Sequence, residues 1–379
     1  MSLTRRWNPF TRWRRAATAA AELPAPKDSA GHIAAAAMPA TAPVTRLALR
    51  DKVVLSTDGA LEPAASSDDL RETGAIDAEI PEERRVRFFC WLVGAPEAPN
   101  AGSPPAAVIP RTLQMLDRVI ASEALRAALL PRAPHVVPQL MKTLRDEHYS
   151  SADVATRISK DVVLTAEVIR SATSAFQRGD DDGEVDLARA VAMIGAQGLR
   201  RVIANVILRP IFDARGDTLS ARAATQIWKD ADTKARLCAA LASHLALDPF
   251  DGYLAGLLHN TGWTAALRAI DGLQGLTVTA ADLSHPDVVP QLLRRRDTLF
   301  GALVEPWKLS PAMELLAAEV GSRGIDAVQS PLGVALRDAE RLAALHVLAP
   351  ADQRPAASVP MWATLPKSVQ DCYAALSRA

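Results

Sequence analysis

Three pairs of a polar residue followed by proline constrain the fold of this chain most strongly. They are Asp248-Pro249, Ser310-Pro311 and Ser330-Pro331. An Asp or Ser side chain accepts a hydrogen bond from the first turn of a helix, and proline suits the first helical position because it has no amide hydrogen to leave unbonded. Each pair therefore predicts the start of a helix.

Apolar residues recur at helical spacing from residue 111 onward. The longest stretch covers residues 219–246, and Pro210 is predicted to end the helix before it. Further helices are predicted at 287–304, 311–320, 331–347 and 366–378. No strand pattern follows residue 62, so the sequence predicts an all-α, multi-helix bundle.

The composition favours closely packed helices, and the spacing of the cysteines favours a reducing compartment. Hydrophobic residues make up 49% of the chain but aromatic residues only 4%, which is typical of helices that pack through Ala and Leu. A net charge of zero argues against a nucleic-acid surface over the whole chain. Cys90, Cys238 and Cys372 lack metal or disulfide spacing. We see no run of about 18 apolar residues and predict a cytoplasmic protein without a membrane span.

The sequence predicts four segments. Residues 1–45 are basic and then rich in Ala, Pro and Thr without periodicity, so they are expected to form a disordered tail. No apolar core of an export signal follows the basic part, which favours a cytoplasmic protein. Residues 46–110 form a small N-terminal segment, with a hairpin predicted within 46–62, and a Pro-rich linker. Residues 111–350 form the helical domain, and 351–379 a C-terminal helix. Whether the N-terminal segment is a true domain stays open.

Five stretches in order resemble one family. They are PQLMKTLRDEHYSSADVATRISKDVVLTAEVIRSATSAF (138–176), DLARAVAMIGAQGLRRVIANV (186–206), IWKDADTKARLCAALA (227–242), YLAGLLHNTGW (253–263) and FGALVEPWKLSP (300–311). Together they resemble HDOD domains, the HD-related output domains of bacterial signalling proteins, over about residues 125–350. The resemblance implies an HD-like helical bundle.

The resemblance also implies where a metal site would lie. Active HD phosphohydrolases arrange a His, a His-Asp doublet and a later Asp around metal ions. Here His259 stands at the His of the doublet, but Asn260 replaces the Asp, and a neutral amide is a poorer ligand for a hard cation. The upstream His would lie near Trp228, where the sequence has only Lys229 and Asp230. We therefore expect a degenerate site with no metal, no other cofactor and no catalytic residue.

The residues themselves favour structural roles at this motif. His259 is interpreted as a core histidine hydrogen-bonded to backbone, and Asn260 as a helix cap in the left-handed conformation. Asp230 is interpreted as an exposed charge, although it is retained with Trp228 and Trp263 as a candidate for a vestigial cleft. The basic cluster LRRRD (293–297) is interpreted as surface helix charge, and Cys238 as a core residue.

Three functions follow from these interpretations. The first is a non-catalytic regulatory module in signal transduction that acts through other signalling proteins. The second is a divergent metal-dependent phosphohydrolase that uses His259 with Asp230. The third is a nucleotide-sensing domain whose cleft is lined by Trp228, His259 and Trp263. The pathway, the ligand and the oligomeric state stay open.

Overall fold

Helices are the only regular secondary structure in the part of the chain that the structure describes. The computed structural model describes residues 81–95, 107–130, 165–171, 187–214, 216–349, 359 and 362–376. All of them lie within one compact unit, Ala64–Ala379. The all-α prediction is confirmed for these residues. The predicted tail (1–45) and hairpin (46–62) lie outside them.

Besides helical residues at 165–171, the helices are, in chain order, α3 (Glu82–Val93), α4 (Val108–Ala121), α5 (Glu123–Leu129), α9 (Leu187–Phe212), α10 (Leu219–His244), α11 (Pro249–His259), α12 (Thr261–Asp271), α13 (Ala280–Leu283), α14 (Val289–Val304), α15 (Pro311–Arg323), α16 (Pro331–Leu348) and α18 (Lys367–Leu376). Short 3₁₀ turns at η2 (Glu305–Trp307), η3 (Ile325–Ala327) and η4 (Trp362–Thr364) join some of them.

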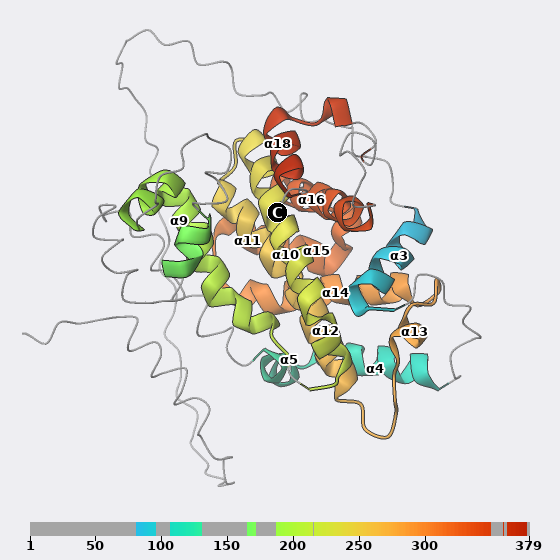
Figure 1. Ribbon diagram of the computed structural model, residues 1–379. Helices are drawn as coiled ribbons and strands as arrows, with labels where there is room; N and C mark the ends of the chain where they lie inside the picture. Colours follow the sequence, from blue (N-terminus) through green and yellow to red (C-terminus); the bar gives the residue numbers. More distant parts are fainter. Residues whose placement is uncertain are drawn as a thin grey trace, which may run out of the picture. The chain divides into compact units, whose positions relative to one another are not determined.

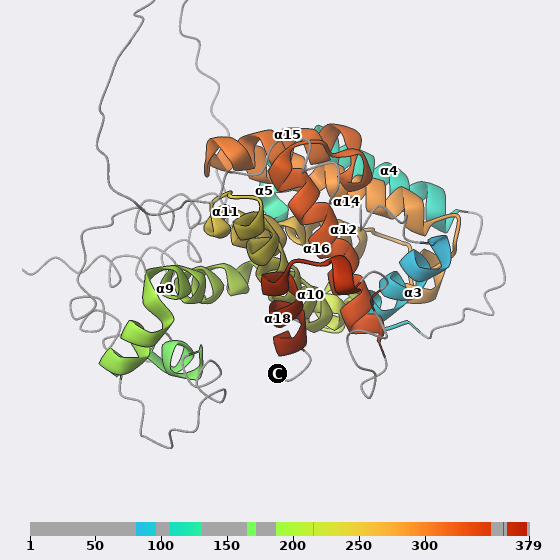
Figure 2. The ribbon, with the colours of Figure 1, turned by 90° about the horizontal axis from the view of Figure 1, so that it is seen from above.

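Helix α10 is the central element of this arrangement (Figures 1 and 2). It packs against α11, α16, α12, α18 and α3. Its buried face consists mainly of small side chains: Ala231, Ala235, Cys238, Ala239 and Ala242. Small side chains let neighbouring helices approach closely, as the Ala-rich composition predicts. Cys238 is fully buried, as predicted.

The closest approach joins α10 to α11. A Cβ atom on Gly256 would lie 2.6 Å from the backbone nitrogen of Ala235, and one on Gly252 would lie 2.7 Å from the carbonyl oxygen of Cys238. Side chains at these two positions would collide with backbone, which cannot rotate away. Glycine at both positions therefore fixes the distance between the two helices.

The three predicted caps are confirmed. Asp248 accepts a hydrogen bond from the Phe250 amide at 2.8 Å, and Ser310 and Ser330 cap α15 and α16 in the same way. The predicted end at Pro210 is wrong, because α9 continues to Phe212. Since only two helical residues follow this proline, its missing amide removes one hydrogen bond of the final turn and does not break the helix.

Two segments fold differently from the sequence-based interpretation. Part of the predicted N-terminal segment and linker (46–110) forms α3, which buries Phe88, Phe89 and Leu92 and packs against α10, α14 and α16 of the helical domain. Thr261 was expected to follow the end of a helix in a turn. It instead begins α12, a second buried helix.

One helix of the described part is long and apolar enough to cross a membrane by length and composition. This is Arg189–Phe212 within α9, where Arg200, Arg201 and Arg209 interrupt the apolar residues. Gly195 has non-helical angles (φ 63°, ψ −178°) and kinks it. Core helices of other proteins pass the same test, so this helix is weak evidence for a span.

Candidate functional site

His259 and Asn260 lie at the junction of α11 and α12, and both are fully buried. Asn260 has φ −74° and ψ −4°, which is right-handed, so the predicted left-handed cap is wrong. Gly262 follows in the first turn of α12. A Cβ atom on Gly262 would lie 2.3 Å from the carbonyl oxygen of Arg296. Gly262 thus allows α12 to approach α14, and the chain continues from one helix directly into the next.

The ammonium group of Lys234 occupies the centre of the site. Its Nζ lies 2.8 Å from Asn260 Oδ1, 2.8 Å from Glu340 Oε2 and 3.1 Å from Asp230 Oδ2. It also lies 3.4 Å from His259 Nδ1, and the Lys234 side chain is fully buried. A fixed positive charge therefore contacts the side chains at the positions where the family resemblance places a metal.

Both the oxygen and the nitrogen of the Asn260 side-chain amide form hydrogen bonds in this site. Its Nδ2 donates to Asp230 Oδ2 at 2.8 Å and to the carbonyl oxygen of Ile227 at 2.9 Å, while its Oδ1 accepts from Lys234. An aspartate at this position would have no donor for either acceptor and would face a second carboxylate. The amide of Asn260 therefore supplies both the acceptor that Lys234 requires and the donors that Asp230 and Ile227 require.

His259 contacts acidic side chains, so its predicted hydrogen bond to backbone is wrong. Its Nε2 lies 3.2 Å from Asp297 Oδ1, and its Nδ1 lies 2.9 Å from Glu340 Oε2. Both ring nitrogens can donate only when the imidazole carries both protons. The ring also packs edge-on against Phe300, with centroids 5.1 Å apart.

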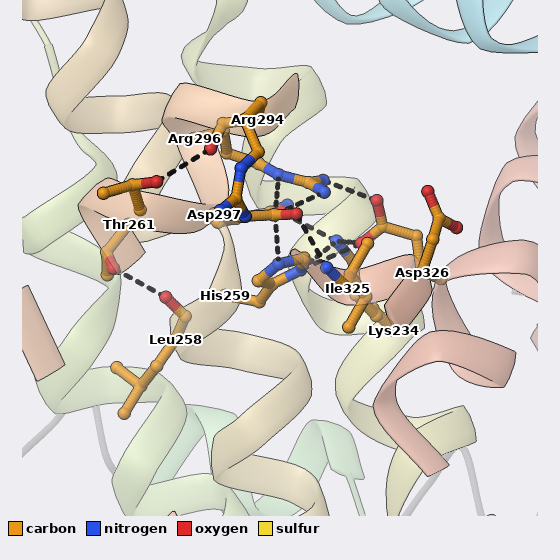
Figure 3. A network of polar contacts seen from close by, with 12 residues as sticks. Lys234, Leu258, His259, Thr261, Arg294, Arg296, Asp297, Ile325 and Asp326 are labelled. Atoms are coloured by element: carbon orange, nitrogen blue, oxygen red, sulfur yellow. Dashed lines mark hydrogen bonds and ion pairs between the residues drawn. The ribbon is translucent and has the colours of Figure 1, made fainter. Parts of the chain in front are cut away.

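Arg296 completes the site from α14. Its Nε donates to Asp297 Oδ1 at 2.8 Å, and its Nη1 donates to Glu340 Oε1. Asp297 Oδ2 accepts from the Ile325 amide at 2.8 Å. We call the connected set the buried charge network (Figure 3). Its members are Asp230, Lys234, His259, Asn260, Arg296, Asp297 and Glu340.

The network holds the Asp297 and Glu340 carboxylates in the charged form. Burial alone would raise the pKa of Asp297, but Arg296 and His259 together lower it below the ordinary value. Burial would likewise raise the pKa of Glu340, yet Arg296, Lys234 and His259 hold it well below that value. Burial would lower the pKa of Arg296, but Asp297 and Glu340 raise it. Opposite charges outweigh burial at each of these groups.

These pKa shifts predict a loss of stability in acid. A depressed carboxyl pKa contributes stability that is complete above the ordinary values, 4.5 for Glu340 and 3.8 for Asp297, and that is lost as pH falls toward the folded-state values. The free energy of unfolding should therefore fall below about pH 5. Denaturant unfolding at several pH values would measure this slope. Glu340→Gln should flatten the dependence of the unfolding free energy on pH, whereas Glu314→Gln, outside the network, should not. Equal slopes for these two variants would contradict the prediction.

The structure brings together some of the residues singled out in the sequence and separates others. Asp230 is 1% exposed, so its interpretation as an exposed charge is wrong. Trp263 lies beneath the Arg296 guanidinium, with a distance of 5.5 Å to the ring centroid. Trp228 is not in the site, since it packs against Phe212 and Arg209 at another part of α10.

Four members of the network were not predicted as site residues. They are Lys234, Arg296, Asp297 and Glu340. The interpretation of LRRRD as surface charge is wrong for its last two residues, which are 0% and 3% exposed. The available signal was the spacing of Asp230 and Lys234, which are four residues apart within a helix whose buried side chains are mainly apolar.

The residues of the site do not fit a divalent metal ion. Among the described residues, no group of three or more His, Cys, Asp or Glu side chains is placed to hold one. Carboxylate oxygens are the ligands that hard cations require, and here they face Lys234 and Arg296. Within that part of the chain, Asp230 Oδ1 is the one carboxylate oxygen of the network that is buried without a hydrogen-bond partner. A metal would have to displace the ammonium or repel it at short range.

The comparisons with known proteins give a domain family and a fold. The family profile described as the HDOD domain matches residues 130–320. A solved structure from Shewanella amazonensis SB2B, named "Putative metal-dependent phosphohydrolase", is 18% identical with a TM-score of 0.50, and the match covers 72% of this chain and 99% of that chain. An HDOD domain protein with unknown function from Geobacter sulfurreducens is 20% identical with a TM-score of 0.47, and covers 68% of this chain and 88% of its own.

No curated protein matches the chain. The Shewanella structure supports the fold alone at this level of identity. The family profile spans more than half of the sequence, and it includes the His259-Asn260 junction and both helices that meet there. The chain therefore belongs to the HDOD domain family.

Proposed function

We propose that this protein is a non-catalytic regulatory module that acts in bacterial signal transduction through contacts with other proteins. The observation that carries the proposal is the position of the Lys234 ammonium among Asp230, His259, Asn260 and Glu340. On this proposal the helical framework of an HD-type domain is kept, and an internal cation stabilises the place where active relatives of the wider superfamily hold a metal. The cytoplasm suits its three free cysteines, Cys90, Cys238 and Cys372.

The chemistry of an ammonium group differs from that of a metal ion. A metal in hydrolases of this kind lowers the pKa of bound water and so generates a nucleophile at neutral pH. Lys234 donates hydrogen bonds only, and its donors are directed at Asn260, Glu340 and Asp230. It accepts no ligand and has no vacant coordination position. Its role in the proposal is to neutralise buried carboxylates.

A hydrolysis assay tests the proposal. Purified protein is incubated with a chromogenic phosphodiester and with nucleoside monophosphates, in the presence of Mn²⁺, Mg²⁺, Fe²⁺ or Zn²⁺. The wild-type protein should show no more metal-dependent turnover than His259→Ala. Turnover by the wild type that is abolished in His259→Ala, with the helical circular dichroism spectrum unchanged, would overturn it.

A divergent phosphohydrolase that uses His259 with Asp230 is the second candidate. The buried Asp230 Oδ1, which has no hydrogen-bond partner among the described residues, favours it, because this oxygen is available as a ligand. The same assay separates the two candidates. If the divergent phosphohydrolase is correct, the wild-type protein should be active, and Asp230→Asn should abolish this activity as fully as His259→Ala does.

A further inference from the structure

Helix α15 presents an uncharged row of side chains to solvent. Its exposed positions before Arg323 are Pro311, Leu315, Ala318 and Ser322, which we call the α15 seam. Leu315 is 57% exposed, more than any other large hydrophobic residue in the part of the chain that the structure describes. The opposite face of α15 is apolar as well, and it is buried in the domain. A helix that is apolar on both faces is ordinarily covered on both.

The spacing of the α15 seam is that of a surface on which helices pair. Its residues follow one another at intervals of four, three and four positions. At 3.6 residues per turn, these intervals place all four residues within an arc of about 60° on one side of the helix. Alternating intervals of three and four residues let two helices pack along their length, with each side chain inserted between those of the other helix. The seam therefore fits another helix.

Contacts with α14 fix the direction in which the α15 seam points. The two helices cross at a pair of glycines, because a Cβ atom on Gly301 would lie 2.5 Å from the carbonyl oxygen of Ala317 and 2.7 Å from the Cα atom of Gly321. So close a crossing prevents α15 from rotating to bury Leu315. The helix also packs against α16 and α11, and it lies at the edge of the described helices (Figure 2). A surface held in one orientation loses less entropy when it binds.

The polar groups at and beside the seam have partners within the chain. The Ser322 hydroxyl donates to the carbonyl oxygen of Ala318 at 2.7 Å. Glu314 Oε2 lies 3.1 Å from Lys308 Nζ, and Glu319 accepts hydrogen bonds from two backbone amides just before α16. Covering the seam would therefore leave none of these side chains without a hydrogen-bond partner.

We propose that the α15 seam is the interface of a symmetric dimer, in which it packs against the α15 seam of a second copy of this chain. Two-fold symmetry requires a surface that is complementary to itself. Positions 311 and 322 have the same midpoint as positions 315 and 318. When two copies are antiparallel about this midpoint, Leu315 of each copy faces Ala318 of the other. Pro311 of each copy likewise faces Ser322 of the other, so each larger side chain meets a smaller one.

The glutamates beside the seam favour the antiparallel orientation. Helical geometry places Glu314 and Gly321 on one flank of the seam, and Ala312 and Glu319 on the other. In an antiparallel two-fold pair, equivalent flanks meet. Glu314 then lies beside Gly321 of the second copy, and Glu319 lies beside Ala312 of the second copy. In a parallel pair Glu314 would instead lie beside Glu319 of the second copy, and like charges at these flanking positions oppose pairing.

The length of α15 limits the strength of the dimer. A helix of 13 residues is about 20 Å long. One pair of such helices forms an interface near or below about 1,200 Å², which is the low end of the range for stable protein complexes. The dimer is therefore expected to dissociate on dilution, and its dissociation constant can be measured.

Sedimentation velocity of the full chain, from micromolar to millimolar concentration, tests the interface. The wild-type protein should change reversibly from monomer to dimer as its concentration rises. Leu315→Glu places a charge at the centre of the seam and should be monomeric throughout. Leu125→Glu is the matched control, because Leu125 is also exposed but lies on α5, and this variant should dimerise as the wild type does. A monomeric wild type, or equal effects of the two substitutions, would overturn the proposal.

Two further variants distinguish this interface from general hydrophobic association. Ala318→Leu should raise the dimer dissociation constant about tenfold or more, because two leucines would then meet at each contact. Adding Leu315→Ala exchanges the two side chains, restores one leucine and one alanine at each contact, and should return the dissociation constant close to the wild-type value. General association of apolar surface predicts instead that Ala318→Leu strengthens the dimer. That result, with the helical circular dichroism spectrum unchanged, would overturn the antiparallel seam.

Discussion

Lys234→Met is expected to lower the free energy of unfolding by about 3–5 kcal/mol, because it removes one partner from a buried ion-pair network. Methionine keeps an unbranched side chain that is one atom shorter, so the change removes mainly the charged group. Asp230 and Glu340 would lose the ammonium that neutralises them, and Asn260 Oδ1 would lose its donor. Denaturant unfolding at neutral pH, followed by circular dichroism, measures the loss.

The same helix supplies the control for this prediction. Lys229 lies on α10 but is exposed, and Lys229→Met should change the free energy of unfolding by less than about 0.5 kcal/mol. The double variant Lys234→Met with Glu340→Gln should lose less stability than the sum of the two single variants, because it leaves fewer unpaired charges. A Lys234→Met protein as stable as the Lys229 variant would show that the ammonium does not hold the site together.

Gly256→Ala is expected to destabilise the protein by about 1–3 kcal/mol or more through overpacking. The added Cβ would lie 2.6 Å from the backbone nitrogen of Ala235 and 2.6 Å from the backbone carbon of Lys234. These atoms belong to the helix backbone, so α11 would have to move away from α10. That movement would also draw His259 and Asn260 away from Lys234, and would weaken the network. Thermal or denaturant unfolding measures the change.

Gly272→Ala is the matched control for this steric prediction. Gly272 is exposed at the end of α12, has φ −76°, and the nearest atom to its added Cβ would be 3.4 Å away. Alanine fits there and should be neutral, or stabilising by up to about 1 kcal/mol, because it restricts the unfolded chain. The close approach of α10 and α11 would be refuted by a Gly256→Ala protein as stable as the Gly272→Ala protein.

The helices could be predicted from the sequence because their signals are local. A cap and a proline lie next to each other in the chain, and helical spacing appears within a short window. The same locality explains where the prediction failed. The first turn of α12 contains Gly262, which packs closely against the backbone of Arg296, a residue on another helix that is distant in the sequence.

The motif at His259 and Asn260 could be found from the sequence, but the chemistry around it could not. Lys234 and Glu340 are 106 positions apart, and Arg296 and Glu340 are 44 apart. Residues so distant meet only after α10, α11, α14 and α16 have packed together. Charged residues are also rarely fully buried unless paired, so a basic cluster such as residues 293–297 is ordinarily exposed. Here the helix turns Arg296 inward to meet Asp297 and Glu340.

We propose that the Lys234 ammonium takes the place of a metal ion, and the metal content of the protein tests this most directly. The full chain is produced with manganese, iron, zinc and magnesium available and without an affinity tag that binds metal, and it is then measured by elemental analysis beside His259→Ala. The account predicts that both proteins contain far less than one metal ion per chain and do not differ. One metal ion per wild-type chain, lost in His259→Ala, would contradict it.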